Sequence, residues 1–475
     1  MQQILTYAFL VIYTVTILGI VLVIITDNRN PLKTLPWIIV LVFAPVVGLV
    51  FYFFFGQNLS KQRIISRRTR KRITMQLEEA LDDGRPDIPD EHLPLARLLA
   101  ATIPSVPLYG SRITPYTDGK SKMEALLAEI ARAKHHIHIQ YYIFCDDTTG
   151  CRLRDALVAK ARQGVEVRIL YDDVGSSAAK KSFFRSMRSE GIEVYAFLHV
   201  KFPLFTSKVN YRNHRKIAVI DGEVAYTGGM NIADYYINGL PKIGTWRDMH
   251  MRIEGDAVND LQEIFLTIWN KETKQNIGGE AYFPKHKEQS DTTNIVVAIV
   301  DRTPKKNSRM LSHAYAMSIY SAQKNVHIVN PYFVPTSSIN KALQRTIERG
   351  VDVTIMVSSA SDIPFTPDAA LYKLHKLMKR GATVYMYNGG FHHSKIMMVD
   401  DIFCTVGTAN LNSRSLRYDY ETNAFIFNKE ITGELNEMFQ NDIEHCTQLT
   451  PEFWKKRSPW KKFVGWFANL FTPFL

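Results

Sequence analysis

The sequence predicts an α/β protein with two related lobes, each a mixed sheet flanked by helices, preceded by two transmembrane helices. Three observations lead to this prediction. A long signature occurs twice with unchanged spacing, helix-like and strand-like stretches alternate around both copies, and the first sixty residues hold two apolar segments. A chain of 475 residues is long enough for two globular units that each bury a core.

The repeated signature is His-x-Lys-x4-Asp-x6-Gly-x-x-Asn, and its second copy begins 179 residues after the first (393 − 214). The first copy consists of His214, Lys216, Asp221, Gly228 and Asn231, and the second of His393, Lys395, Asp400, Gly407 and Asn410. A single short motif often misleads, but two copies with identical spacing indicate a duplicated half-site. Two half-sites imply one shared pocket.

The alternation of elements supports the duplication. Around the first copy we expect a helix at 123–133, a strand at 137–144, a helix at 153–163 and a buried strand at 165–171. Segments 133–139 and 164–167 have counterparts at 322–328 and 350–353. The repeat therefore covers whole lobes, each with a sheet flanked by helices.

The amino-terminal part is predicted to cross a membrane twice. Segments 4–25 and 35–55 are almost wholly apolar, and each reaches the ~20 residues that a spanning helix needs. A cleaved signal peptide is the alternative for the first segment, but the chain start lacks a basic region. Seven basic residues lie within 61–72, against only Arg29 and Lys33 between the segments, which places the lobes in the cytoplasm. We therefore expect a multi-pass protein of the cell inner (cytoplasmic) membrane.

These features divide the chain into four expected parts. They are a transmembrane hairpin at 1–60, a basic juxtamembrane segment and linker at 61–107, a first lobe at 108–285, and a second lobe with an amphipathic tail at 286–475. The tail carries a stripe of apolar residues beside Lys461 and Lys462, and that stripe is Trp460, Phe463, Val464, Phe467, Phe471 and Phe474. This periodicity fits an interfacial helix and an ordinary packed terminal helix equally well.

Charge and cysteine content narrow the class of partner. The net charge of +12 predicts attraction to a polyanion, either nucleic acid or an anionic lipid surface, and the apolar segments favour lipid. The four cysteines show neither a Cys-x-x-Cys pair nor zinc-ligand spacing, and no carboxylate or cysteine completes a metal site beside His135, His136 and His138. We expect neither a metal nor an organic cofactor.

The signature residues suit chemistry on a phosphodiester. In each copy the His and the Lys lie two apart before an apolar run, so on a strand they share one face. Lys216 and Lys395 can neutralise the non-bridging oxygens, while Asn231 and Asn410 donate hydrogen bonds to them. One His can attack phosphorus and the other can protonate the departing alcohol. For a single copy, a strand with a buried His and Lys would be an adequate explanation.

These motifs resemble those of the phospholipase D superfamily, and most closely its bacterial cardiolipin synthases. The resemblance spans nearly the whole chain and also includes Pro36-Trp37, Pro45-x-x-Gly48, the segment 140–144 and the segment 245–248. It implies two phospholipase-D-like lobes that transfer a phosphatidyl group between two phosphatidylglycerol molecules. The implied products are cardiolipin and glycerol, formed through a phosphohistidine intermediate, and the implied partner is anionic membrane lipid with no nucleic acid.

The resemblance also implies roles for further residues. Asp248 and Glu421 match the acids that orient the two His rings, although each could instead be a solvated loop carboxylate. Asp221 and Asp400 belong to the signature, but in the family they brace the fold. Gly229, where many relatives carry Ser, and Thr408 are expected to join Asn231 and Asn410 at the phosphate. We assign His214 as nucleophile and His393 as acid/base, although the two copies are too symmetric for the sequence to settle these roles.

Three other functions remain open. A phospholipase D that releases phosphatidic acid would share the covalent intermediate and differ only in the acceptor. A nuclease of the same superfamily would suit the basic charge, although it needs no membrane hairpin. A scaffold with decayed half-sites is the non-enzymatic alternative. The sequence does not indicate the oligomeric state.

Overall fold

The computed structural model describes residues 88–102, 111–199, 211–286, 295–304, 309–363 and 366–470, with isolated positions between 3 and 15. The predicted transmembrane segments lie outside these residues, apart from those isolated positions, and so does the basic segment 61–72. Within the described ranges, no helix combines the length and the apolar character that a membrane crossing requires. The elements below all belong to one compact unit, Ser60–His199 with Arg212–Leu475.

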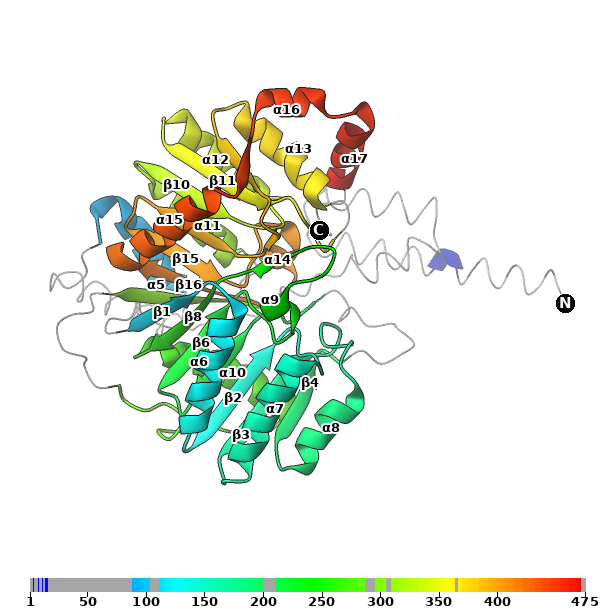
Figure 1. Cartoon of the computed structure of the whole chain (residues 1–475), viewed down its shortest axis with the longest axis vertical. Coiled ribbons are helices and arrows are strands. Elements are labelled where there is room, and N and C mark those ends of the chain that lie inside the picture. The colour runs from blue at the N-terminus through cyan, green and yellow to red at the C-terminus, as the bar shows by residue number, and fades with distance from the viewer. Residues whose placement is uncertain are drawn as a thin grey trace. The chain divides into compact units, whose positions relative to one another are not determined.

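The first lobe is built on a seven-stranded sheet in the order β1-β8-β6-β5-β2-β3-β4 (Figure 1). Its strands are β1 (Arg112–Tyr116), β2 (His136–Tyr141), β3 (Glu166–Asp172), β4 (Glu193–Phe197), β5 (Ile217–Ile220), β6 (Val224–Gly228) and β8 (His250–Glu254). Its helices are α6 (Gly119–Arg132), α7 (Thr148–Ala161), α8 (Lys181–Ser189), α9 (Tyr235–Asn238) and α10 (Ala257–Thr273). Strands β2, β3 and β4 run parallel and the other pairs are antiparallel, which makes the sheet mixed as predicted.

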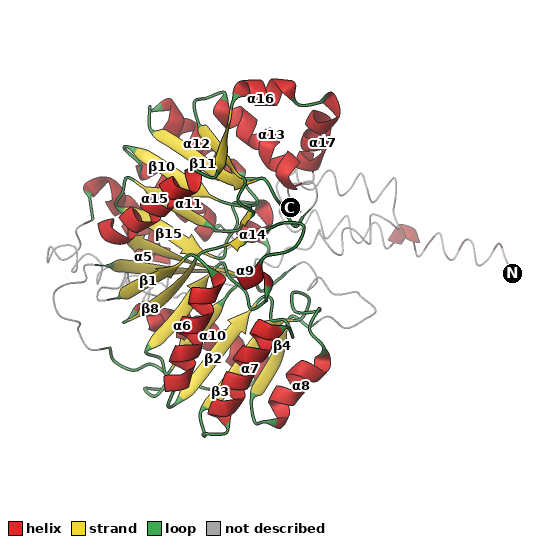
Figure 2. Ribbon diagram, in the orientation of Figure 1, coloured by secondary structure: helices red, strands yellow, loops and turns green. Residues whose placement is uncertain are grey.

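The second lobe has an eight-stranded sheet in the order β17-β12-β11-β10-β14-β15-β16-β9. Its strands are β9 (Val296–Arg302), β10 (Asn325–Val329), β11 (Asp352–Ser358), β12 (Thr383–Tyr387), β14 (Ile396–Val399), β15 (Phe403–Gly407), β16 (Glu421–Phe427) and β17 (Cys446–Leu449). Its helices are α11 (Met310–Ser321), α12 (Ser337–Glu348), α13 (Thr366–Met378), α14 (Ser413–Arg417), α15 (Lys429–Ile443), α16 (Pro451–Lys456) and α17 (Pro459–Leu470). Figure 2 shows helices beside the strands of both sheets.

The two sheets have the same topology. The strand order β4-β3-β2-β5-β6-β8-β1 of the first matches β12-β11-β10-β14-β15-β16-β9 of the second, with the same parallel and antiparallel pairings. The second sheet adds only β17 at its edge, antiparallel to β12. The duplication predicted from the repeated signature is therefore confirmed at the level of whole sheets.

One apolar cluster is shared by the two lobes. It includes Ile217, Val219 and Met251 from the first sheet together with Ile396 and Met398 from the second. All five side chains are at most 2% exposed. Burial of such side chains stabilises the folded state by roughly 1.5–3 kcal/mol each, so this cluster holds the two lobes together. Strands β5 and β14, which follow the two His-Lys pairs, both contribute to it.

The segment before the first lobe makes an unexpected contact. The sequence predicts a linker over 61–107, but within it η2 (Asp90–His92) and α5 (Leu93–Thr102) form helices that pack on the second lobe. The His92 ring lies 2.9 Å from Ser321 Oγ through Nδ1, and 3.4 Å from Asp400 Oδ2 through Nε2. The composition of a ten-residue helix does not reveal which of two similar lobes it covers.

The signature aspartates directly follow β5 and β14, at the opposite ends of these strands from the His and Lys pairs. Asp221 accepts the backbone N–H groups of residues 134, 135 and 136 at 2.8–2.9 Å. Asp400 accepts those of residues 323, 324 and 325 at 2.7–3.0 Å. Both residues have φ near +54°, a conformation that Asp tolerates better than most residues. Each carboxylate therefore fixes the turn that leads into a central strand, β2 or β10.

Replacing Asp400 with Ala should lower the free energy of unfolding by about 1–3 kcal/mol, because three backbone donors lose a charged acceptor. Asp400→Asn keeps one carbonyl oxygen and tolerates the positive φ, so its loss should be smaller. Chemical denaturation of the purified protein measures both variants. The exposed Asp155 supplies the control, and an Asp155→Ala change equal in effect to Asp400→Ala would contradict the bracing role.

Candidate active site

The two signature His-Lys pairs stand directly before equivalent strands. His214 and Lys216 precede β5, and His393 and Lys395 precede β14. Because β5 and β14 occupy the same place in the two sheets and share the apolar cluster, both pairs lie where the lobes meet. The sequence placed these pairs on the strands themselves, whereas the structure places them in the extended segment just before.

Each His ring is held by a carboxylate of the opposite lobe. His214 Nδ1 lies 3.2 Å from Oε2 of Glu421, which opens β16 in the second lobe. His393 Nδ1 lies 2.6 Å from Oδ2 of Asp248 in the first lobe. Both carboxylates are at most 1% exposed, so neither is a solvated loop residue. A carboxylate at Nδ1 fixes the ring orientation and the tautomer, and it leaves Nε2 to face a substrate.

Backbone bridges reinforce this exchange. The His214 N–H donates to the carbonyl of Tyr420 at 2.9 Å, and the His393 N–H donates to the carbonyl of Arg247 at 2.6 Å. The second contact extends a short parallel ladder between β7 (Trp246–Arg247) and β13 (Phe391–His392). Main chain and side chain of each His are therefore both attached to the other lobe.

The two lysines are buried beside the rings. Lys216 Nζ donates to the His214 carbonyl at 2.7 Å, and Lys395 Nζ donates to the His393 carbonyl. Burial lowers the pKa of Lys216 to about 7 and that of Lys395 to about 8. The Lys395 charge further lowers the pKa of Lys216, while Glu421 acts to raise the pKa of both lysines. Carboxylates of both lobes, Asp248 and Glu421, therefore act on the pKa of each lysine.

The surroundings of His393 favour its neutral form. Burial, followed by the charge of Lys395, lowers the pKa of this imidazole to about 4, although Asp248 acts in the opposite direction. Nδ1 lies 2.6 Å from the Asp248 carboxylate and 2.8 Å from Lys395 Nζ. We place the ring proton on Nδ1, toward Asp248, because a carboxylate can only accept and Lys395 already has the His393 carbonyl as acceptor. A bound phosphodiester anion would favour the protonated ring.

The four residues expected at the phosphate divide into two groups. The Thr408 hydroxyl donates to Glu421 and accepts the Thr422 N–H at 2.9 Å, so it supports the carboxylate instead of facing a phosphate. The Gly229 N–H donates to the Met249 carbonyl at 2.7 Å. A Cβ at Gly229 would lie 2.1 Å from Asp248 Oδ1, so the missing side chain makes room for that carboxylate. Both residues thus differ from the expectation, because each serves the acid behind a His.

The two asparagines are not equivalent. Asn231 donates from Nδ2 to Tyr236 OH at 2.9 Å and accepts the Ile143 N–H at 3.1 Å. Asn410 Oδ1 is buried and lacks a hydrogen-bond partner within the described part of the chain. Phosphate oxygens only accept hydrogen bonds, so Asn410 can meet a phosphate only by donating from Nδ2, the group that Asn231 directs at Tyr236.

Aromatic side chains around the rings were missed by the sequence reasoning. The Tyr142 ring centroid lies 5.0 Å from that of His214, and those of Trp246, Phe391 and Tyr332 lie 5.3–5.9 Å from that of His393. Tyr142 and Trp246 belong to segments 140–144 and 245–248, which carried the family resemblance, so the sequence could have placed these two side chains at the site. Tyr332 follows β10 and has no such signal.

Two of the clustered histidines, His136 and His138, lie on β2 and contact one amide side chain. His136 and His138 are fully buried, and both rings contact Gln262, at 2.8 Å in each case. The described residues contain no group of three or more His, Cys, Asp or Glu side chains arranged to hold a metal ion.

Two lobes of one topology, with a His-Lys pair in each and the orienting acids exchanged between them, define a two-lobed phospholipase-D-like protein. The family model described as "Cardiolipin synthase, PLD-like domain" matches residues 126–269 and 315–443, and "Phospholipase_D-nuclease N-terminal" matches residues 14–57. The chain belongs to the cardiolipin synthase family of the phospholipase D superfamily.

Relatives match along nearly the whole chain. The cardiolipin synthase of Listeria monocytogenes serotype 4b is 35% identical over 483 residues, covering 99% of both chains. The major cardiolipin synthase of Bacillus subtilis is 35% identical over 475 residues, covering 98% of both chains. Among solved structures, the phosphatidylserine synthase of Haemophilus influenzae matches with a TM-score of 0.61 at 14% identity, covering 76% of this chain and 95% of that one. That structural match supports the two-lobed fold.

Replacing Glu421 with Gln should lower kcat by about 10- to 100-fold, because the amide cannot stabilise the imidazolium that forms at His214. Phosphatidyl transfer by purified protein in mixed micelles measures the effect. Glu437→Gln, on the exposed face of α15, is the matched control and should behave as wild type. Equal activity of the two variants would exclude Glu421 from the site.

Above the pKa of the free His393 ring, kcat/KM falls as pH rises. Its decline should steepen through about pH 7 to 8, because Lys216 and Lys395 lose their protons there and with them their attraction for phosphate. Lys216→Arg keeps its charge throughout this range. Any activity that this variant retains should therefore decline at higher pH than that of wild type. A wild-type profile that stays flat up to pH ~9 would contradict the assignment of these lysines.

Proposed function

We propose that this member of the cardiolipin synthase family transfers a phosphatidyl group from one phosphatidylglycerol to another, giving cardiolipin and glycerol. The observation that carries the proposal is the pair of imidazoles, each held at Nδ1 by a buried acid of the opposite lobe. Such a pair supplies a nucleophile and an acid/base to a single phosphorus atom.

In the proposed first step, His214 Nε2 bonds to the phosphorus of the donor lipid. The bond from phosphorus to the glycerol oxygen breaks, and His393 gives that oxygen a proton. Lys216, Lys395 and Asn410 offset the negative charge that develops on the non-bridging oxygens. The scheme involves no cofactor.

In the second step, the hydroxyl of the acceptor lipid gives its proton to His393 and its oxygen bonds to phosphorus. The bond from phosphorus to His214 breaks and cardiolipin is released. Water in place of the hydroxyl would give phosphatidic acid, so access to the intermediate decides between transfer and hydrolysis.

Purified protein supplied with labelled phosphatidylglycerol should form cardiolipin and glycerol, and His214→Ala or His393→Ala should reduce turnover by at least about 10³-fold, because each removes a group that bonds to substrate or carries a proton. Substantial turnover by either variant would refute the scheme. Phosphatidic acid as the main product would establish hydrolysis instead, and cleavage of plasmid DNA would favour the nuclease.

A substrate with a better leaving group separates the roles of the two His residues. Phosphatidyl p-nitrophenol needs little acid assistance, so His393→Ala should still release a first equivalent of nitrophenol, whereas His214→Ala should not. Release of nitrophenol by His214→Ala but not by His393→Ala would make His393 the nucleophile and His214 the acid/base.

We also propose that segments 4–25 and 35–55 anchor the lobes on the cytoplasmic side of the inner membrane. Their apolar length and the basic segment 61–72 support this topology. The protein should resist extraction from membranes by carbonate, and a cysteine introduced at Asp155 should react with an impermeant reagent only after the cells are opened. Labelling of intact spheroplasts would contradict this topology.

A further inference from the structure

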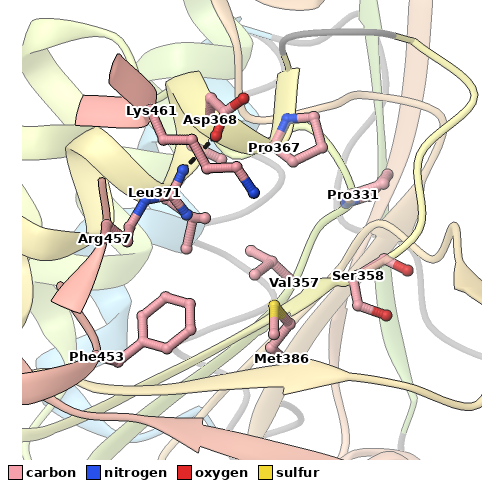
Figure 3. A pocket seen from close by; sticks show the side chains of 12 residues that line it. Pro331, Val357, Ser358, Pro367, Asp368, Leu371, Met386, Phe453, Arg457 and Lys461 are labelled. Carbon is pink, nitrogen blue, oxygen red and sulfur yellow. Dashed lines mark hydrogen bonds and ion pairs between the residues drawn. The ribbon is translucent and has the colours of Figure 1, made fainter. Parts of the chain in front are cut away.

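A cavity of about 320 Å³ lies beside the second half-site, between the carboxyl ends of β10, β11 and β12 and the helices α13, α16 and α17 (Figure 3). Its volume is at the lower end of the range for small-molecule sites. The apolar wall is formed by Val357, Leu371, Met386 and Phe453. The proposed chemistry at the two His residues makes no use of this cavity.

The cavity shares structure with the active site. Ser358 lines it, and the Ser358 hydroxyl accepts the N–H of His392, the neighbour of His393, at 3.1 Å. Pro331 lines it as well and directly precedes Tyr332, whose ring faces His393. The cavity wall is therefore linked to the wall of the active site twice, through the chain at Pro331 and through a hydrogen bond at Ser358.

Two cationic side chains, Arg457 and Lys461, lie at one side of the apolar wall. Figure 3 shows the Lys461 side chain extending over the cavity, with Arg457 next to it and paired with Asp368. The Arg457 side chain is 10% exposed, and its Nε is buried with no partner among the described residues. An apolar wall beside a cation matches a molecule with a hydrocarbon part and an anionic group.

The helix that carries Lys461 has the character of a membrane-interface element. On α17, Trp460 is 70% exposed, and Phe463, Trp466 and Phe467 are 45–48% exposed. The opposite side of the helix packs closely on α13, where a Cβ at Gly465 would lie 2.7 Å from the Asp368 carbonyl oxygen. Exposed aromatic side chains beside lysines are typical of helices that lie in the headgroup region of an anionic bilayer. The cavity therefore lies under an element suited to contact lipid.

We propose that this cavity receives part of the acceptor phospholipid of the proposed reaction, with a segment of one acyl chain against Leu371 and Phe453 and the phosphate at Lys461. The inference depends on the proposed function. The phosphate of the donor must lie between the two His residues, where Lys216 and Lys395 supply its positive charge. The phosphate of the acceptor is not attacked, so it needs a separate cation near the site.

The cavity would then decide the fate of the covalent intermediate. The acceptor hydroxyl oxygen bonds to phosphorus as the bond from phosphorus to His214 Nε2 breaks, and the hydroxyl proton passes to His393. No further reactant is required. If the acceptor binds poorly, water takes its place and phosphatidic acid forms.

The test measures how the full-length enzyme partitions its intermediate in phosphatidylglycerol vesicles. Leu371→Trp fills the cavity and Lys461→Gln removes its cation. The ratio of phosphatidic acid to cardiolipin should rise roughly tenfold for the first and roughly threefold for the second, about 1.4 and 0.7 kcal/mol. Release of glycerol in the first turnover should be unchanged. Lys462→Gln is the matched control, since Lys462 Nζ donates to the Lys455 carbonyl at 3.0 Å, and its ratio should stay at the wild-type value.

An unchanged ratio in the Lys461→Gln enzyme, or an equal rise in Lys461→Gln and Lys462→Gln, would overturn the proposal. A second readout does not need turnover. In the full-length His214→Ala protein, phosphatidylglycerol with a photoreactive acyl chain should label peptides of α13 and α16, and Leu371→Trp should prevent this labelling. Labelling confined to α17 would also overturn the proposal. Labelling of the cavity without glycerol release by the wild-type enzyme would refute the transfer scheme and the acceptor role, while supporting a lipid site.

Discussion

The exchange of buried carboxylates between the lobes is the interaction on which the site depends. Each imidazole is oriented by an acid of the other lobe, Glu421 for His214 and Asp248 for His393. Buried charges are costly unless they are paired, and an acid that lost its ring would remain buried without its partner. The electrostatics of the site and the attachment of the lobes therefore support each other.

This constraint explains why the shared apolar cluster and the backbone bridges lie where they do. Strands β5 and β14 carry the signature residues and also contribute to the cluster that joins the lobes. The short ladder between β7 and β13 ends one residue from both Asp248 and His393. Close packing of this kind leaves little room for relative movement of the two lobes, and so for movement of the two rings that they hold.

Much of this arrangement could be predicted from the sequence. The repeated signature predicted the duplication, and the alternation of helix-like and strand-like stretches around it predicted the two sheets, because both patterns are local in the sequence. The helix at 93–102 could not be placed, since its apolar face is compatible with either lobe. The contacts of Thr408 and Gly229 were also missed, because they depend on how closely the opposite acid approaches. The cavity beneath α17 combines elements more than a hundred residues apart and has no local signal in the sequence.

The two halves share a topology but not every contact, and they belong to one polypeptide chain. In a symmetric pair of identical subunits, any substitution would appear on both sides of the reacting centre. Here one half carries Gly229 and an Asn231 amide that donates to Tyr236. The other half carries Thr408, which donates to Glu421, and an Asn410 whose Oδ1 has no partner among the described residues. Joining the copies in one polypeptide breaks the symmetry, so that each side can specialise in a different stage of the catalytic cycle.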